Sequence, residues 1–353
     1  MSRIENLIKT DKIVGQDVKI VVSNLQERMG DLLEGKRILI SGAAGFLGSW
    51  YTDILYALGA EIVGIDNLST GLLENLKHLL NTPRFHFEQC DVTKYEWDGT
   101  KYDYVLHLAA RPSPDDYIKH PVETLLVSSE GTLRMLEIAR CCDATFLYTS
   151  TSEVYGSPGV IPTPEEYWGY VNPIGLRSCY DEGKRYAEAL CMAYLRQYGL
   201  DVRISRIFNT YGPRLDWSMP GYGRVIVKFI LQALKNQSIT IYGDGLQTRS
   251  FCYVADNTEA HILLLTNPKA KGEIVNIGND QEITILDLAK TIKQLTNSKS
   301  ELVFKPPRPD DPRRRKPNIT KAKQLLQWQP RTTLKEGLQK TINWIKTKIN
   351  KQP

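Results

Sequence analysis

Short apolar runs alternate with helically spaced apolar positions along the first part of the chain. The runs are rich in β-branched and aromatic residues, as strands are. They are RILIS (37–41), EIVGID (61–66), RFHFEQCDV (84–92), YDYVLHLAA (102–110) and ATFLYTS (144–150). This alternation predicts a parallel sheet with helices on both faces. Ligands of such sheets bind beyond the carboxyl ends of the strands, so the residues following each run are the candidates for chemistry.

A glycine-rich turn, GAAGFLG (42–48), follows the first predicted strand directly and precedes the helical pattern SWYTDILYALG. Gly42 allows a tight turn, Gly45 lets the backbone approach a pyrophosphate, and Gly48 lets the helix pack closely on the strand. The phosphates would lie at the helix N-terminus, where free amides and the helix dipole favour anions. The turn predicts a dinucleotide site in a Rossmann-type, doubly wound α/β fold.

Acidic residues lie at the ends of the second and third predicted strands. Asp66 can accept hydrogen bonds from the ribose hydroxyls of adenosine, which favours NAD over NADP. Asp91 is a candidate adenine contact, with a plain helix cap as the equally good alternative. The glycine spacing is G-x-x-G-x-x-G and resembles the extended short-chain dehydrogenase/reductases. The predicted cofactor contacts are Gly42, Gly45, Phe46, Leu47, Gly48, Asp66, Asn67, Asp91, Val92, Leu108, Ala109, Ala110, Tyr180 and Lys184.

The segment GLRSCYDEGKRYAE (175–188) places Tyr180 and Lys184 four residues apart, on one face of a predicted helix. A phenol ionises near pH 10, and we expect the nearby ammonium to lower that pKa. The pair could then take a proton from a sugar or alcohol hydroxyl while a hydride leaves the same carbon. A surface Tyr and a surface Lys are the more common explanation of this spacing alone.

Thr151, Ser152 and Glu153 follow the strand ATFLYTS, at the edge where a parallel sheet delivers catalytic groups. Ser and Thr at a strand end usually form turns. Here a hydroxyl can also hydrogen-bond the substrate oxygen that Tyr180 contacts.

Composition narrows the classes of protein. The net charge of +5 suits an anionic ligand without requiring nucleic acid. The six cysteines show no C-x-x-C or metal-ligand spacing, so we expect reduced thiols in a cytoplasmic protein and no metal. No apolar run approaches the roughly 18 residues of a membrane span, and the N-terminus lacks the apolar core of a signal peptide.

Seven segments occur in an order that resembles the UDP-glucuronate decarboxylase branch of the NAD-dependent epimerase/dehydratase family, over about residues 36–348. They are GAAGFLG, SPDDY, TSEVYG, NPIGLRSCYDEGKRYAE, RIFNTYGPR, GDGLQTRSFCYV and RRRKPNITKAKQLLQWQP. The resemblance implies bound NAD, a UDP-sugar acid as substrate, and a homodimer built on two long helices per subunit. Residues 121–142 and 179–198 fit those helices.

The resemblance also implies a reaction in which no net oxidation occurs. Tyr180 would take the C4 hydroxyl proton while Lys184 holds the nicotinamide ribose. In the resulting 4-keto sugar the carboxylate is β to a ketone, so carbon dioxide can leave. Tyr180 with Ser152 or Thr151 would stabilise the enolate oxygen. Protonation at C5 and return of the hydride would give UDP-xylose.

Substrate contacts implied by the resemblance are Ser113, Tyr117, Glu153, Asn209, Arg214, Lys228, Tyr242, Arg249 and Arg315. Arg249 would clamp the diphosphate. Arg315, immediately before Lys-Pro, would meet the substrate carboxylate, although a proline-rich basic run such as 305–316 is normally a solvated loop. Lys228 and Ser128 stand where the family and the superfamily usually have Asn.

Glu153 separates the related activities. The 4,6-dehydratases carry two adjacent acids at this turn, whereas Ser152 takes the first of those positions here, and many 4-epimerases lack the acid. The alternatives are a UDP-glucuronate or UDP-glucose 4-epimerase, a decarboxylase that stops at the 4-keto pentose, and an idle NAD-binding regulator. An intact Tyr180, Lys184 and Glu153 argue against the regulator.

Three regions are expected along the chain. Residues 1–34 are predicted to form a helical extension whose favoured role is packing. Residues 35–205 are predicted to form mainly the NAD-binding domain with the catalytic residues. Residues 206–350 are predicted to form mainly a smaller, mixed UDP-sugar-binding region, from which the chain crosses back once to the large sheet.

Overall fold

The computed structural model describes residues 4–215, 224–307 and 311–350, so residues 308–310 of the proline-rich run lie outside it. Among the described residues, a seven-stranded sheet has the order β11-β6-β5-β4-β1-β2-β3, and every neighbouring pair is parallel. Its strands are β1 (Arg37–Ser41), β2 (Glu61–Asp66), β3 (Phe85–Gln89), β4 (Tyr104–His107), β5 (Thr145–Thr151), β6 (Val202–Ile207) and β11 (Ile274–Ile277). The predicted Rossmann-type sheet is confirmed.

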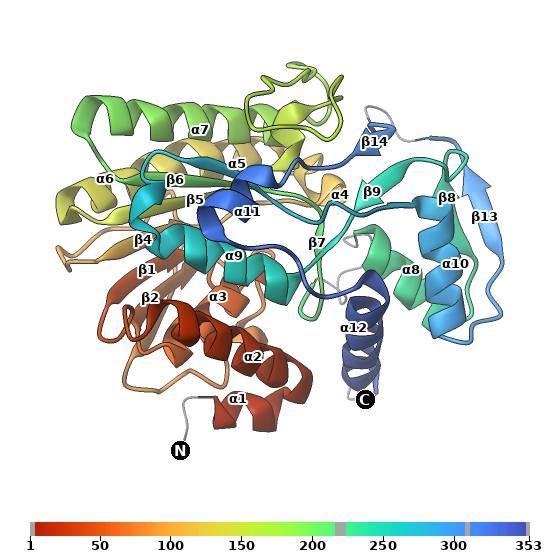
Figure 1. The fold of residues 1–353 in the computed structure, drawn as a ribbon, viewed down its shortest axis with the longest axis horizontal. Helices are drawn as coiled ribbons and strands as arrows, with labels where there is room; N and C mark the ends of the chain where they lie inside the picture. Colours follow the sequence, from red (N-terminus) through yellow and green to blue (C-terminus); the bar gives the residue numbers. More distant parts are fainter. Residues whose placement is uncertain (1–3, 216–223, 308–310, 351–353) are drawn as a thin grey trace.

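Helices cover both faces of this sheet (Figure 1). Strand side chains point alternately to the two faces, so Ile38 and Ile40 join one apolar core while Leu39 joins the other. The first core also takes α2 (Lys12–Met29), α3 (Phe46–Ala57) and α9 (Val254–Thr266). The second takes α6 (Thr132–Cys142) and α7 (Ser178–Tyr198).

The long helix predicted over residues 121–142 is present, but one turn of it is widened. It consists of α5 (Pro121–Leu126), the π-turn η2 (Val127–Gly131) and α6. Ser128 lies in this π-turn, where its Cβ would come within 3.1 Å of a Cβ added at Gly183 of α7. The small residue at 183 therefore lets the two helices approach closely.

The N-terminal helices are part of the core. After α1 (Glu5–Thr10), α2 buries one apolar stripe that includes Val14, Val18 and Leu25. Asp17 accepts a hydrogen bond of 2.7 Å from the Tyr253 hydroxyl and pairs with Lys340 of α12 (Leu334–Ile349). These contacts tie α2 to the C-terminal helix α12 and to β10.

Smaller sheets follow β6 and face the large one. They pair β7 (Thr210–Tyr211) with β10 (Cys252–Tyr253), β8 (Ile239–Tyr242) with β13 (Leu302–Lys305), and β9 (Thr248–Ser250) with β12 (Glu282–Thr284) and β14 (Arg314–Arg315). The helices of this part are α8 (Val225–Leu234) and α10 (Ile285–Leu295). Between them the chain returns to the large sheet at β11, and α11 (Thr320–Leu326) packs on that strand. The remaining short elements are α4 (Pro114–Tyr117), η1 (Leu73–Asn75), η3 (Ser152–Tyr155) and η4 (Pro268–Ala270).

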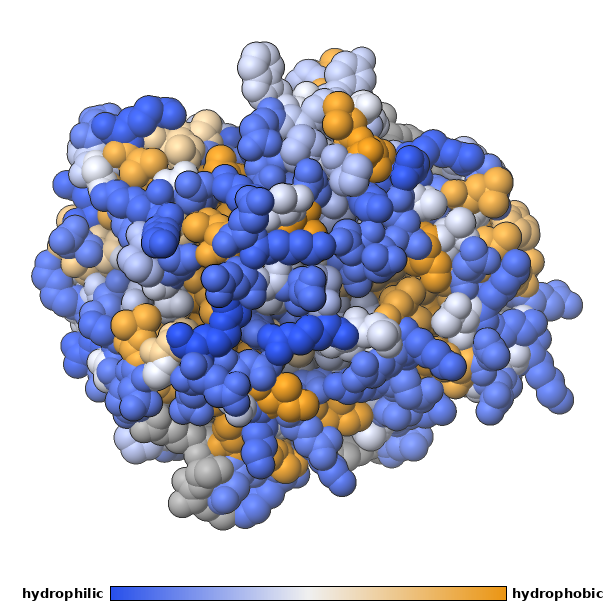
Figure 2. All heavy atoms as spheres, viewed as in Figure 1, coloured by the Kyte–Doolittle hydropathy of each residue, from blue (hydrophilic) through white to orange (hydrophobic). Residues whose placement is uncertain are grey.

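The surface is mostly hydrophilic on the face in Figure 2, with small separate apolar clusters. Within the described residues, no helix has both the length and the apolar character needed to cross a bilayer. The described part of the chain also contains no group of His, Cys, Asp or Glu arranged to hold a metal ion.

Candidate active site

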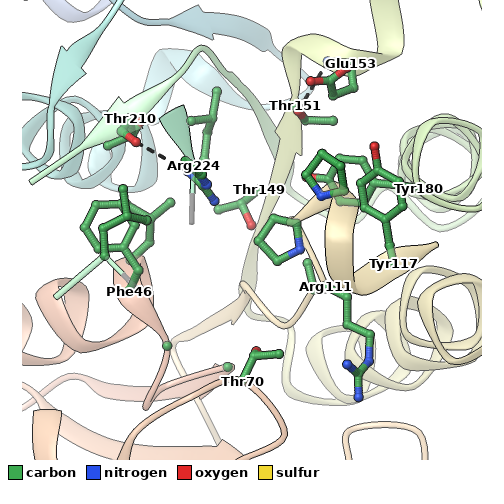
Figure 3. A pocket seen from close by; sticks show the side chains of 18 of the residues that line it. Phe46, Thr70, Arg111, Tyr117, Thr149, Thr151, Glu153, Tyr180, Thr210 and Arg224 are labelled. Carbon is green, nitrogen blue, oxygen red and sulfur yellow. Dashed lines mark hydrogen bonds between the residues drawn. The ribbon is translucent and has the colours of Figure 1, made fainter. Parts of the chain in front are cut away.

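A cleft of about 580 Å³ opens beyond the carboxyl ends of the large sheet's strands. Figure 3 shows that its walls come from distant parts of the chain. Gly42, Asp66, Leu108 and Thr151 line it from the ends of β1, β2, β4 and β5 or the residues that follow. The opposite wall belongs to the smaller sheets and α8, so substrate and cofactor could meet between the two parts.

The glycine turn has room only for glycine at two points. Gly42 has φ +74°, and a Cβ there would lie 2.7 Å from the backbone nitrogen of Ala109. A Cβ on Gly48 would overlap the carbonyl oxygen of Gly42. Gly45 is the N-cap of α3, so the first amides of that helix are directed at the cleft. The predicted pyrophosphate cradle is therefore sterically intact.

Asp66 and Asp91 lie side by side at the next two strand ends. Asp66 accepts backbone amides from Ala44 at 3.0 Å and from Leu68 at 2.8 Å. Burial raises the pKa of Asp66 despite these amides. Asp91 accepts hydrogen bonds from the amide and hydroxyl of Thr93 and from Asn67, and it lines the cleft. No helix begins there, so the alternative prediction of a helix cap is wrong.

Lys184 is buried and donates a hydrogen bond of 2.8 Å to the carbonyl oxygen of Thr149. Its ammonium is 6.0 Å from the centre of the Tyr180 ring. Burial lowers the pKa of Lys184 to about 7. Burial likewise raises the pKa of Tyr180 to about 12, against the opposing charge of Arg224 and a hydrogen bond with Thr151. The prediction that Lys184 lowers the pKa of Tyr180 is wrong in this structure, because loss of solvent outweighs nearby positive charge.

Glu153, in η3 directly after β5, accepts hydrogen bonds from two guanidinium groups. Arg315 donates two hydrogen bonds to its two carboxylate oxygens, at 2.5 and 2.8 Å. Arg177 donates a third, at 2.5 Å, to Oε2. Burial alone would raise the pKa of Glu153, but Arg315 and Arg177 together lower it to about 2.

Asp181 extends this cluster on the first turn of α7. Its Oδ2 lies 3.9 Å from Nε of Arg177, and its Oδ1 is buried with no hydrogen-bond partner among the described residues. Burial and the charge of Glu153 raise the pKa of Asp181 to about 7. The cluster therefore contains two arginines and one carboxylate, Glu153, that is ionised at neutral pH. Its fourth member, Asp181, titrates near neutrality.

The phenol rings of Tyr117 and Tyr180 stack at 5.2 Å between centroids. The amide nitrogen of Asn209 is buried and has no partner in the described part of the chain, and the residue holds a φ of +27°. Lys228 lies 4.9 Å from the centre of the Tyr242 ring. Each of these side chains lines the cleft.

Two predicted substrate contacts lie elsewhere. Arg214 forms a buried ion pair of 2.8 Å with Asp53 of α3, whose other oxygen meets His78. A buried carboxylate needs such partners, so Arg214 serves the core. Ser113 is buried at the N-terminus of α4 and does not line the cleft. All the other predicted site residues line the cleft.

Arg177 and Arg224 line the cleft but were not among the predicted contacts. Arg177 precedes Tyr180 by three positions, which would bring it near that residue at the start of a helix. Arg224 precedes Lys228 by four positions and caps α8. Helical spacing from the two identified residues was the signal available in the sequence.

A doubly wound parallel sheet with this glycine turn, and with a buried Tyr-x-x-x-Lys pair beside β5, defines an extended short-chain dehydrogenase/reductase. The chain belongs to the family described as GDP-mannose 4,6 dehydratase, whose sequence model matches residues 39–341.

Relatives agree with the narrower resemblance. The protein called UDP-glucuronic acid decarboxylase 1 in Xenopus tropicalis is 46% identical over 317 residues, which are 90% of this chain and 74% of the relative. UDP-glucuronic acid decarboxylase 3 of Arabidopsis thaliana is 49% identical, over 86% of each chain. The crystal structure of UDP-glucuronic acid 4-epimerase from Bacillus cereus, with UDP-glucuronic acid and NAD, has a TM-score of 0.79 at 29% identity, covering 88% of this chain and 99% of that one. The resemblance to UDP-glucuronate decarboxylases is confirmed.

Proposed function

We propose that the protein converts UDP-glucuronate to UDP-xylose and carbon dioxide through a 4-keto intermediate, without net oxidation. One observation carries the proposal: Glu153 and Arg315 form a bidentate pair in the same cleft as Tyr180 and the glycine turn. A guanidinium in that position suits a substrate that brings its own carboxylate. The identity to decarboxylases supports the same activity.

The cofactor is NAD in this proposal, and the residues fit it. Gly42, Gly45 and Gly48 leave the space that a pyrophosphate needs, and Asp66 lies where ribose hydroxyls would be accepted. Bound there, NAD would accept a hydride from C4 of the sugar and later return it.

Tyr180 exchanges the proton of the C4 hydroxyl, with Thr151 as its hydrogen-bond partner. Because burial raises the pKa of Tyr180 to about 12, the phenolate is scarce at pH 7 and depends on nearby cations such as Arg224. Once C4 is a ketone, loss of carbon dioxide leaves negative charge on the C4 oxygen. The hydroxyls of Tyr180 and Thr151 then stabilise that oxygen.

Glu153 acts as an anion in this scheme. A carboxylate with a pKa of about 2 is a weak base at neutral pH, so its first task is to orient Arg315. Arg315 has a buried Nε with no partner in the described part of the chain, which leaves it further hydrogen-bonding capacity. That capacity suits the carboxylate of the substrate.

The proposal includes a homodimer through α5–α6 and α7, which pack together on one side of the molecule (Figure 1). Large apolar side chains on these helices are exposed: Val122, Leu125, Leu126, Leu133, Tyr186 and Tyr198. Burying such a patch against a second copy would be favourable. The six free cysteines fit a reducing compartment, and we infer the cytoplasm.

Incubation with UDP-glucuronate tests the activity directly. Carbon dioxide with UDP-xylose is the expected result. UDP-galacturonate without gas would indicate a 4-epimerase, and gas with a 4-keto pentose would indicate a reaction that stops after decarboxylation. Absence of any product with NAD supplied would contradict an enzyme of this kind.

A further inference from the structure

The cleft contains two guanidinium groups on one carboxylate, which is more than a simple ion pair requires. Arg315, on β14, donates hydrogen bonds to Glu153. Arg177, the residue that precedes α7, donates another. All three side chains are at least four-fifths shielded from solvent, with 6%, 14% and 16% of Arg315, Arg177 and Glu153 exposed. Burying a charge costs free energy unless the charge is paired. The presence of Arg177, in addition to the pair of Glu153 and Arg315, therefore needs an explanation.

A substrate carboxylate changes the balance of charge. With one arginine, Glu153 and the incoming carboxylate would compete for the same cation and repel each other across a poorly solvated cleft. With two arginines, each anion can have its own partner. Arg315 is the one suited to move toward substrate, because it lies on a two-residue strand beside Arg249, another cleft cation. Arg177 is fixed at the start of a long helix and is also close to Asp181.

We propose that Arg177 is the standing counter-ion of Glu153 and thereby frees Arg315 to bind the carboxylate of the substrate. Arg177 is a positioning residue in this inference, because it acts through Glu153. The inference rests on the proposed use of UDP-glucuronate and adds a residue that sets the specificity for a uronic acid. Without Arg177, Arg315 stays paired with Glu153, and the substrate carboxylate has no cation of its own.

A double-mutant cycle on substrate binding tests this. Arg177→Met, Glu153→Gln and the double variant are titrated with UDP-glucuronate and with UDP by calorimetry, with NAD present. Arg177→Met is expected to weaken UDP-glucuronate binding about tenfold and to leave UDP binding within about twofold, as for loss of one charged hydrogen bond. In the double variant the neutral glutamine that replaces Glu153 needs no counter-ion, so UDP-glucuronate affinity is expected to recover most of that loss.

Other outcomes contradict the inference. Equal losses for both ligands, or losses that add in the double variant, would mean that Arg177 only supports the fold. Arg196→Met, an exposed arginine on the same helix, is the matched control for charge and is expected to bind both ligands normally. If Arg177→Met does not fold, Arg177→Lys replaces it in the cycle, with a smaller loss of about threefold that Glu153→Gln again reverses.

The test also separates this inference from the proposed function. It measures binding, so it holds for a protein that binds UDP-glucuronate but releases no carbon dioxide. In that case the proposed activity fails, and the cycle still decides the role of Arg177. A wild-type protein that binds UDP and UDP-glucuronate equally well would overturn the inference itself.

Discussion

The ammonium of Lys184 is hydrogen-bonded to the carbonyl oxygen of Thr149 at 2.8 Å, while the ring of Tyr180 lies with its centre 6.0 Å away. The lysine is almost fully buried, and burial lowers its pKa to about 7. The structure therefore holds an ammonium that water would stabilise better. Keeping this ammonium buried therefore costs stability.

Lys184→Met should stabilise the protein and remove its activity. Because the pKa of Lys184 is lowered in the folded state, the unfolded chain binds more protons between about pH 7 and 10.5, and wild-type stability rises with pH across that window. Methionine removes this penalty, offset by about 1 kcal/mol for the lost hydrogen bond. We expect the melting temperature at pH 7 to rise by a few degrees, with turnover reduced at least about 100-fold.

The pH dependence provides the check on this prediction. The difference in melting temperature should shrink as the pH is raised toward 10.5, and above that pH the wild-type lysine is mostly neutral in both states. Lys235→Met, at the exposed C-cap of α8, should show neither effect. A variant that melts below the wild type at pH 7 would show that the Thr149 contact contributes more than burial costs.

Glu153→Gln should suppress carbon dioxide release about 100-fold while NAD affinity stays within about twofold, because in the proposed mechanism Glu153 acts on the sugar and not on the cofactor. It should also alter acid stability. The pKa of Glu153 is lowered to about 2 from 4.5, so its contribution is present above pH 4.5 and is lost as the pH falls toward 2. Between pH 4.5 and 2, the melting temperature of the variant should therefore fall less steeply than that of the wild type. Unchanged turnover would remove Glu153 from the mechanism.

Sequence patterns were enough to predict the large sheet and the tight glycine turn that follows β1. The first five strands are apolar runs with clear ends, and the turn at Gly42 has steric requirements that few residues meet. Glu153 directly follows β5, and Tyr180 lies on α7, which packs beside β5. The topology of a parallel sheet therefore brings the two residues to the same edge.

Other features depend on contacts that no local pattern encodes. Arg214 looked like a ligand of substrate because its motif suggested it, but its partner Asp53 is 161 positions earlier in the chain. The pKa of Tyr180 has the opposite shift from the expectation, because spacing along a helix reveals a nearby charge and does not reveal burial. The spacing of Arg177 from Tyr180 could have identified it as a site residue, but no sequence pattern reveals its hydrogen bond with Glu153.

Lys228→Asn should weaken binding of UDP and UDP-glucuronate equally, by about threefold to tenfold. The ammonium lies in the cleft beside Tyr242, and we propose that it meets the diphosphate common to both ligands. The effect should be largest at low salt, because an interaction between an ammonium and a phosphate is screened by ions. Calorimetric titrations at two ionic strengths measure it. A loss confined to UDP-glucuronate would place Lys228 at the sugar instead.

For the proposed homodimer, Leu133→Glu should shift the protein from dimer to monomer in sedimentation experiments. Leu133 is 43% exposed on α6, beside the other apolar residues of that face. A carboxylate buried in an apolar interface would lose its solvent without gaining a partner. Phe304→Glu is the control, because Phe304 is 52% exposed on β13, far from α6 in Figure 1. An unchanged dimer would exclude this helical face as the interface.

Arg315→Ala should separate recognition of the sugar acid from recognition of the nucleotide. Arg315 is 5% exposed and contacts Glu153 through both terminal nitrogens of its guanidinium. Its loss leaves Glu153 neutralised by Arg177, so the fold should survive, but the substrate carboxylate loses its cation. We expect UDP-glucuronate affinity to fall about 10- to 100-fold, with UDP binding within about twofold. Lysine at position 315 should recover part of the loss, because it restores charge without the paired geometry. Equal losses for both ligands would mean that Arg315 maintains the shape of the cleft, and the carboxylate of the substrate would then need another partner.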